Sequence, residues 1–263
     1  MITSASLADA VALLRQRRPL VHNLTSAVVA NFTANALLSL GAAPVMAEGA
    51  DEVALVAAAA DALVINLGML TPQRASAMRT AVAAASGAGR PWALDPVGVG
   101  AIAPRTEFAR DLCRLRPAAI RGNASEILGL LGEGGGRGVD TTARSDTAVA
   151  AARQLARETG AVVAVTGAVD YVTDGARLIS LHNGDPVMTR VTGMGCAATA
   201  IIGACLATDP APLAGVAHAL SIVGIAGEAA AQGASGPGSM QIAFLDALAA
   251  LDTTRLRVEP PPG

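Results

Sequence analysis

A glycine-rich segment in the last third of the chain places a cysteine at the start of a predicted helix. The segment reads Val191-Thr-Gly-Met-Gly-Cys196, and small or apolar residues without proline fill positions 197–207. Backbone N–H groups at a helix start have no intrahelical partner, and with the helix dipole they favour a bound anion. A thiol in the first turn should have its pKa lowered toward the thiolate. The segment therefore predicts a site of phosphoryl transfer, with Gly193 and Gly195 shaping an anion-binding loop beside Cys196.

Other polar residues stand where predicted strands end. In a parallel α/β sheet the ligand crevice lies beyond the carboxyl ends of the strands, so these side chains should lie close together. Arg121 can hold a phosphate with two hydrogen bonds, and Asp95 and Glu126 offer the hard oxygen ligands that Mg²⁺ prefers. This set predicts phosphoryl transfer from a nucleotide. The residues at the strand ends are Asn23, Gly68, Asp95, Arg121, Asn123, Thr166 and Gly167.

Several of these residues also have an ordinary structural interpretation. Glu126 follows Asn123 by three residues, so it can simply cap the helix that begins there, and spacing alone slightly favours this reading. Asp95 before a proline can be a turn device, and Thr166–Gly167 is a common way to end a strand. Met46 would more often be a core residue than a ligand contact.

The composition narrows the available chemistry. All 19 basic residues are arginine, which excludes Schiff-base chemistry and a lysine-dependent phosphate loop, and leaves arginine, backbone amides or a metal to bind phosphate. The net charge of −2 provides no basic field for nucleic acid. Three widely spaced cysteines (Cys113, Cys196 and Cys205) show neither a disulfide framework nor metal-ligand spacing, so we expect a cytoplasmic protein.

Neither a signal peptide nor a membrane span is expected. Asp9 lies inside the first apolar stretch, and the nearby arginines follow that stretch instead of preceding it. Charged or polar residues, among them Asp61, Asp209, His218 and Glu228, interrupt the later apolar segments before they reach about 20 uncharged residues. We expect these segments to be buried helices, some of them at an interface between subunits.

Short apolar strands alternate with helical segments along most of the chain. Ala62–Leu67 has the continuous apolar pattern of a strand buried on both faces. Asp174-Gly175 lies between two short strands and indicates a hairpin. We therefore expect one α/β domain over residues 1–253, with a mostly parallel sheet covered by helices on both faces. Residues 254–263 are expected to be a disordered tail, and Gly132–Val139 a mobile surface loop.

The chain resembles the hydroxyethylthiazole kinases over nearly its whole length, from about Leu13 to Leu251, and the resemblance rests on six ordered motifs. This family has the ribokinase-like fold, a three-layer sandwich around a mostly parallel sheet. The wider fold usually has aspartate where this chain has Cys196, whereas cysteine matches the thiazole kinases. Each motif alone is unspecific, but together they are specific. The motifs are Val21-His-Asn-Leu-Thr25, Ala43-Pro-Val-Met46, Asp95-Pro-Val-Gly-Val-Gly-Ala101, Arg121-Gly-Asn-Ala-Ser-Glu126, Val165-Thr-Gly167 and Val191-Thr-Gly-Met-Gly-Cys196.

The resemblance implies phosphorylation of the hydroxyl of 4-methyl-5-(2-hydroxyethyl)thiazole by ATP and Mg²⁺, as a step of thiamine diphosphate biosynthesis or salvage. It also implies a homotrimer with active sites between the subunits. Carried over by motif, the roles are substrate binding for Asn23, Met46, Gly68 and Gly193, ATP binding for Arg121, Asn123, Thr166 and Gly167, and metal binding for Asp95 and Glu126. Gly193 and Gly195 would form the anion hole, and Cys196 would be a replaceable proton acceptor beside the hydroxyl.

Three other functions stay open from the sequence. A kinase of the same fold could act on another small alcohol, such as the hydroxymethylpyrimidine of the same pathway. A thiol hydrolase could use Cys196 as nucleophile, with His22 as the histidine nearest to a predicted strand end. A non-catalytic sensor of thiazole or nucleotide could retain the pocket, although the intact acids and glycine loop argue against lost chemistry.

Overall fold

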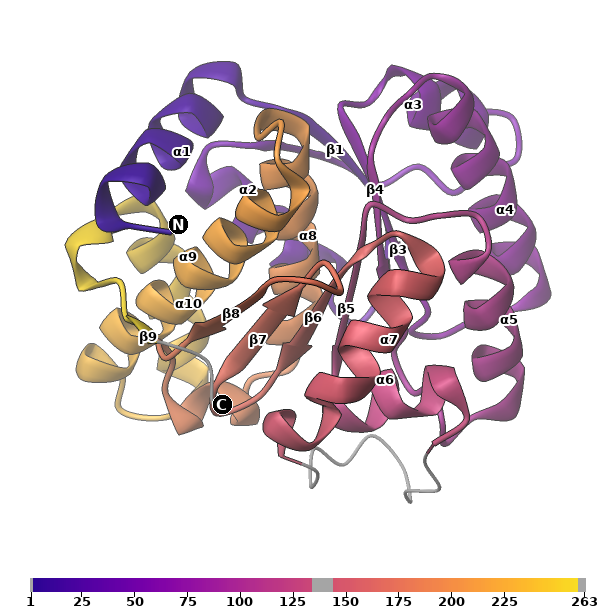
Figure 1. The fold of residues 1–263 in the computed structure, drawn as a ribbon. Coiled ribbons are helices and arrows are strands. Elements are labelled where there is room, and N and C mark those ends of the chain that lie inside the picture. The colour runs from indigo at the N-terminus through magenta and orange to yellow at the C-terminus, as the bar shows by residue number, and fades with distance from the viewer. Residues whose placement is uncertain (1, 134–143, 260–263) are drawn as a thin grey trace.

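The computed structural model describes residues 2–133 and 144–259 of the chain, and its strands form one nine-stranded sheet (Figure 1). The strand order is β2-β1-β3-β4-β5-β6-β7-β8-β9. All pairs from β2 to β6 are parallel, and the last three pairs are antiparallel. The strands are β1 (Leu20–Leu24), β2 (Ala43–Val45), β3 (Ala62–Asn66), β4 (Trp92–Asp95), β5 (Ala119–Asn123), β6 (Val162–Thr166), β7 (Asp170–Thr173), β8 (Leu178–Leu181) and β9 (Val258–Glu259).

Helices cover both faces of this sheet, as Figure 1 shows, and each layer of helices closes one of two hydrophobic clusters. The two outer layers and the sheet make the expected three-layer α/β sandwich, so the predicted fold class is confirmed. One layer contains α1 (Ser4–Arg17), α2 (Ala30–Leu40), α8 (Met194–Thr208), α9 (Pro212–Gly233) and α10 (Pro237–Ala249). The other contains α3 (Val53–Ala59), α4 (Pro72–Gly87), α5 (Ala103–Cys113), α6 (Ala124–Leu131) and α7 (Val149–Thr159).

Small residues allow the helices to lie close to the sheet. All five residues of β3 are buried, because helices cover both of its faces. A side chain at Gly203 of α8 would place its Cβ only 2.7 Å from the Val64 Cγ2 atom of β3. The core is built from alanine and aliphatic side chains, and aromatic residues make up 2% of the sequence. This close packing fixes α8, and hence the glycine loop at its start, over the middle of the sheet.

The predicted hairpin is confirmed, and the predicted tail is wrong over residues 254–259. Gly175 has φ +94° in the turn between the antiparallel strands β7 and β8. Beyond the hairpin, β9 pairs with β8, and the Asn183 side chain accepts a bond from Arg257 N (2.7 Å) and donates one to Arg255 O (2.9 Å). The proline-rich composition of the tail did not predict that residues 258–259 pair with the edge strand β8. Residues 260–263 lie outside the described residues, as does all but the start of the loop predicted at Gly132–Val139.

Helix α9 is long and apolar enough, by length and composition alone, to cross a membrane. In the fold, however, 89% of its most apolar window is buried inside the protein, where it packs between α8 and α10. This helix is a core element, as expected from the sequence.

Candidate active site

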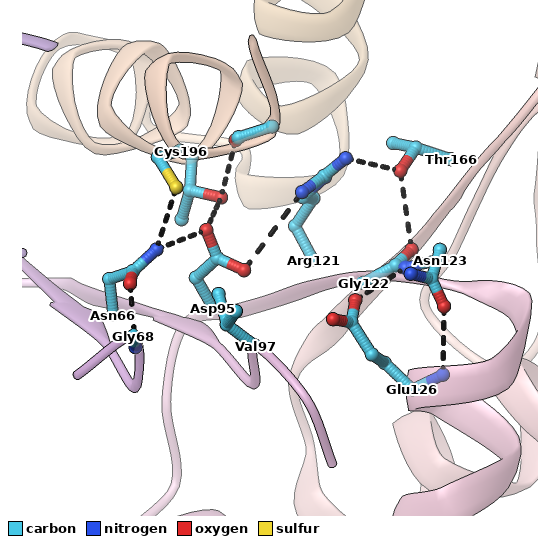
Figure 2. Close-up of polar contacts among 12 residues, drawn as sticks. Asn66, Gly68, Asp95, Val97, Arg121, Gly122, Asn123, Glu126, Thr166 and Cys196 are labelled. Carbon is cyan, nitrogen blue, oxygen red and sulfur yellow. Dashed lines mark hydrogen bonds and ion pairs between the residues drawn. The ribbon is translucent and has the colours of Figure 1, made fainter. Parts of the chain in front are cut away.

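The carboxyl ends of four neighbouring strands bring their polar residues together beneath the start of α8 (Figure 2). Asn66 ends β3, Asp95 ends β4, Arg121 lies in β5 and Thr166 ends β6. Cys196 extends toward them from the first turn of α8 (Figure 2). The parallel pairing of β3 to β6 brings the strand residues to one edge of the sheet, and the packing of α8 on the sheet brings Cys196 to Asn66, 130 positions away in sequence.

Asp95 is fully buried at the centre of this group. Its Oδ2 atom accepts hydrogen bonds from Asn66 Nδ2 (2.7 Å) and Thr199 Oγ1 (3.0 Å). Its Oδ1 atom has no hydrogen-bond partner among the described residues and lies 3.9 Å from Arg121 Nη1. Burial raises the pKa of Asp95, while Arg121, Thr199 and Asn66 act to lower it. A buried carboxylate oxygen without a partner is a position for a cation or a bound water.

Arg121 lies between this carboxylate and the start of α8. Its Nη2 atom donates to Thr166 Oγ1 (2.5 Å), and its side chain is 15% exposed. The guanidinium is so close to Gly195 that a Cβ at that position would collide with Nη1 and stand 3.0 Å from Nη2. Only glycine at position 195 leaves this space to Arg121.

The start of α8 has the geometry of an anion-binding loop. Gly193 is the N-cap residue, and its φ of +95° lies in the left-handed region that favours glycine. A Cβ at Gly193 would stand 3.0 Å from Phe32 Cδ1. The first intrahelical bond runs from Ala197 N to Gly193 O (2.8 Å), which leaves the N–H groups of residues 194–196 without an intrahelical acceptor. These N–H groups and Arg121 form a positive surface suited to phosphate.

The pKa of the Cys196 thiol differs from the predicted one. Its Sγ atom accepts a hydrogen bond from Asn66 Nδ2 (3.2 Å), but burial, reinforced by the charge of Asp95, raises its pKa to about 12. The expected lowering at a helix start is therefore wrong for Cys196. The loss of water around the sulfur and the nearby Asp95 carboxylate outweigh Arg121 and the Asn66 bond.

Glu126 and Asn123 form the helix cap that spacing favoured. Asn123 Oδ1 accepts from Glu126 N (2.9 Å), and Glu126 Oε2 accepts from Asn123 N (2.9 Å). The other oxygen of Glu126 accepts from Gly98 N (3.0 Å), which ties the loop after Asp95 to α6. Burial, and then the charge of Asp95, raise the pKa of Glu126. Glu126 thus has a structural role in the cap, next to the carboxylate of Asp95.

Thr166 and Gly167 shape the turn after β6. Thr166 accepts the bond from Arg121, and Gly167 N donates to Asp170 Oδ1 (2.9 Å). A Cβ at Gly167 would meet Ser145 at 2.9 Å. Burial raises the pKa of Asp170 to about 6, against the lowering effect of the Gly167 bond and Arg121.

Three of the four residues predicted to bind substrate lie in or just after the first three strands: Asn23 in β1, Met46 after β2 and Gly68 after β3. Gly68 N donates to Asn66 Oδ1 (2.9 Å), and a Cβ at Gly68 would stand 2.9 Å from that oxygen. Asn23 is buried, and its Oδ1 atom has no hydrogen-bond partner in the described part of the chain. Met46 is 36% exposed instead of core. It lines a cavity of about 380 Å³ together with Thr25, Ala27, Ala30, Glu48, Met69, Thr71 and Arg74.

Sequence reasoning missed three residues of this group: Asn66, Thr199 and Asp170. Asn66 contacts Asp95, Cys196 and the backbone of Gly68, and it ends a strand just as the predicted residues do, so strand-end position could have revealed it. Thr199 follows Cys196 by three residues, which places it on the same side of α8, but its polarity is hidden in an apolar run. Its contact with Asp95 depends on packing between α8 and the sheet.

The geometry does not support a cysteine–histidine pair. His22 is fully buried in β1, where its Nε2 atom contacts Ala47 O (2.8 Å). Burial lowers the pKa of His22. Among the described residues, the hydrogen bond to Cys196 comes from Asn66 and none comes from a histidine. The alternative function of a thiol hydrolase therefore lacks its histidine base.

The sequence pattern of the hydroxyethylthiazole kinase family matches residues 11–254. A hydroxyethylthiazole kinase of Granulibacter bethesdensis is 60% identical over 246 residues, which cover 93% of this chain and 90% of that protein. One of Escherichia coli K12 is 52% identical over 249 residues, which cover 94% of this chain and 95% of that protein.

Two solved structures are also similar to this chain. The hydroxyethylthiazole kinase of Pyrococcus horikoshii OT3 superposes with a TM-score of 0.90 at 40% identity, covering 97% of this chain and 98% of that one. A ribokinase-like superfamily protein of Enterococcus faecalis shares the fold at a TM-score of 0.68 and 13% identity, covering 90% of this chain and 87% of that one. The extent and identity of these matches show that the chain belongs to the hydroxyethylthiazole kinase family.

Proposed function

We propose that this protein transfers the γ-phosphoryl group of ATP to the hydroxyl of 4-methyl-5-(2-hydroxyethyl)thiazole, in thiamine diphosphate biosynthesis or salvage. The observation that carries the proposal is the Arg121 guanidinium packed against Gly195, at a helix start that has free N–H groups. This arrangement presents concentrated positive charge next to the buried Asp95 carboxylate. The family match supplies the identity of the alcohol.

The transfer forms a bond between the substrate oxygen and the γ-phosphorus, breaks the bond to the β,γ-bridging oxygen, and releases the hydroxyl proton. Its transition state is thought to be loose, so most of the catalysis is positioning and charge stabilisation. In our proposal Arg121 and the N–H groups of residues 194–196 stabilise the transferred group. Thr166, Gly167 and Asn123 line the nucleotide side, and Asn23, Met46 and Gly68 the alcohol side.

Magnesium fits one part of this site. The unpartnered Asp95 Oδ1 atom is a suitable oxygen ligand, directly or through water. Both carboxylate oxygens of Glu126 already accept backbone N–H groups, and the described residues contain no cluster of three acidic, cysteine or histidine side chains fit for a metal. We therefore propose that Asp95 is the main protein contact, with Glu126 adding charge from nearby. Bound Mg²⁺ would neutralise phosphate charge during transfer.

Cys196 has a modest role in the proposed reaction. A thiol with a pKa of about 12 carries its own proton at neutral pH, and the Asn66 bond holds the sulfur toward Asp95. We propose that Cys196 mainly positions the substrate hydroxyl. A loose transition state supports this role, because it places little demand on a base.

We also propose a homotrimer in the cytoplasm, with active sites between subunits. An interface between subunits is supported by exposed apolar side chains, among them Val28 (70% exposed), Leu55 (72%) and Met69 (49%), of which Met69 lines the Met46 cavity. The number of three subunits rests on the resemblance to the family. A cytoplasmic location is supported by the three free cysteines.

An assay of ADP formation with a panel of small alcohols tests the proposed function. We expect the thiazole alcohol to give the highest kcat/KM, well above the hydroxymethylpyrimidine of the same pathway. A preference for the pyrimidine would transfer the proposal to that alcohol. Binding of thiazole without any turnover of ATP would indicate a sensor and overturn it.

A further inference from the structure

Arg74, in the first turn of α4, joins three separate loops through its guanidinium group. Its Nη2 atom donates to Thr25 O (2.5 Å) in the loop after β1, and its Nη1 atom to Gly68 O (2.8 Å) in the loop after β3. Two further bonds reach the Glu48 carboxylate in the loop after β2, at 2.8 Å and 3.2 Å. The side chain of Arg74 is 14% exposed and that of Glu48 is 40% exposed, so the bonds to the two backbone carbonyls are the better shielded from water.

The position of Arg74 is unfavourable for the helix that carries it. A positive charge in the first turn opposes the helix dipole. The start of α4 is already capped by Thr71 Oγ1, which accepts from Arg74 N (3.2 Å), and Pro72 follows at the first helical position. The helix therefore does not need arginine at this position, and the contacts of its guanidinium with the loops account for the residue.

The same guanidinium supports a strained backbone. Met69 has φ +56°, a left-handed conformation that is strained for a non-glycine residue. Arg74 bonds the carbonyl before it, Gly68 O, and lies 3.4 Å from Met69 O itself. Such strain persists where the surroundings fix the backbone, and it is concentrated at functional sites.

The three loops that Arg74 joins carry the residues proposed to bind the alcohol. Asn23 leads into the first loop, Met46 lies in the second, and Gly68 lies in the third. Arg74, Glu48 and Thr25 line the same cavity as Met46. Movement of any one loop would change the shape of this cavity.

We propose that Arg74 is a positioning residue for the alcohol substrate, which fixes the three substrate loops relative to one another through its backbone and Glu48 bonds. The inference rests on the proposed function, because it assigns the cavity beside Met46 to the alcohol. It assigns Arg74 no part in binding the nucleotide, since none of its contacts reaches Arg121, Thr166 or α8.

Steady-state kinetics of Arg74→Met and Arg74→Lys test the proposal. Methionine keeps an apolar stem but removes every donor, whereas lysine keeps the charge and part of the hydrogen bonding. We expect Arg74→Met to raise the KM for the thiazole alcohol about tenfold or more, consistent with the loss of several charge-assisted bonds. The KM for ATP should change less than about twofold, and Arg74→Lys should restore part of the loss.

Arg15→Met is the matched control. Arg15 also donates to three backbone carbonyls (Leu40 O, Leu248 O and Ala249 O), but these lie in α2 and α10 instead of the substrate loops. The Arg15→Met substitution should lower the melting temperature and leave the KM for the alcohol and the KM for ATP unchanged. Hydrogen exchange should become faster at residues 24–29, 46–52 and 67–71 in Arg74→Met only.

Two results would overturn the inference: an equal rise of both KM values in Arg74→Met, or an unchanged KM for the alcohol despite faster exchange in the three loops. If Arg74→Met does not fold, Arg74→Lys and Glu48→Gln decide, since each should raise the KM for the alcohol selectively. Failure of the wild-type protein to phosphorylate the thiazole is a separate result, which defeats the proposed function itself.

Discussion

The thiol of Cys196 lies among groups that act on its proton in opposite directions. Arg121 and the Asn66 bond favour the thiolate, while burial and the Asp95 carboxylate favour the thiol, and the second pair prevails. The neutral thiol beside a buried carboxylate suits a residue that orients a hydroxyl group. A nucleophile or strong base would need a thiol pKa that is lowered toward the thiolate.

Replacement of Cys196 tests this view. We expect Cys196→Ala to lower kcat by about 10- to 100-fold without abolishing turnover, because a misplaced reactant can cost about 100-fold in rate. Cys196→Asp should keep or raise kcat, because a carboxylate is the better proton acceptor. Cys205→Ala, the same change further along α8, is the control and should leave kcat unchanged. An inactive but folded Cys196→Ala protein would show that the sulfur is essential, and an inactive Cys196→Asp would argue against a proton acceptor at this position.

Individual residue roles were harder to predict than residue positions. Asp95, Arg121 and Thr166 meet as the strand-end rule predicts, because the carboxyl ends of parallel strands lie at one edge of the sheet. Cys196 joins them from the first turn of α8. The pKa of Cys196 could not be predicted, since it depends on burial and on a carboxylate from a different strand. The contacts of Thr199 and Arg74 also depend on tertiary packing that leaves no local pattern.

At the scale of the element, the start of α8 restricts which residues can occupy two of its positions. Gly193 must adopt a left-handed φ, and Gly195 must leave room for a guanidinium from β5. The sequence predicted a glycine-shaped helix start because two glycines precede an apolar run. It could not predict that the second glycine makes room for Arg121.

Gly195→Ala tests that packing. The added Cβ would displace Arg121 and break its bond to Thr166, so kcat/KM for ATP should fall by about 10- to 100-fold. The melting temperature should fall only slightly, because the preference of alanine for a helix, about 1 kcal/mol over glycine, offsets part of the loss of that bond. Gly238→Ala in the first turn of α10, where a Cβ meets open space, should leave kcat/KM unchanged. Unaltered ATP kinetics in Gly195→Ala would show that Arg121 is not needed at that place.

Most helices and strands were predictable from local signals. The Asp174-Gly175 turn carries standard turn residues, and the predicted hairpin is confirmed. The start of α4 has a standard cap at Thr71, followed by Pro72. Strand β9 was missed, because two residues in a proline-rich tail pair only with the exposed edge of β8. Edge pairing is a long-range interaction that local composition does not encode.

At the scale of the whole molecule, stability should depend on pH through Asp170. Its pKa is about 6 in the folded protein and near 3.8 when unfolded, so folding favours the protonated form. That contribution is fully present below about pH 4 and is lost as pH rises through about 6. The shift corresponds to at most about 3 kcal/mol, and to less where water reaches the carboxyl.

Urea unfolding of Asp170→Asn from pH 4 to 8 measures this effect. Asparagine keeps an acceptor for Gly167 N but does not ionise. The gain in unfolding free energy over the wild-type protein should therefore grow between pH 4 and 6 and then level off. A difference that stays constant across this range would show that Asp170 has an ordinary pKa.

The central claim is that the site beneath α8 transfers phosphate from ATP to the hydroxyl of the thiazole alcohol. Phosphorus NMR of the purified protein with ATP, Mg²⁺ and 4-methyl-5-(2-hydroxyethyl)thiazole follows both products in one sample. We predict a phosphate monoester signal that grows in equal proportion to the ADP signals. Mass spectrometry of the same sample should show that the alcohol has gained one phosphoryl group. ADP formation with inorganic phosphate only, or no reaction, would contradict the claim.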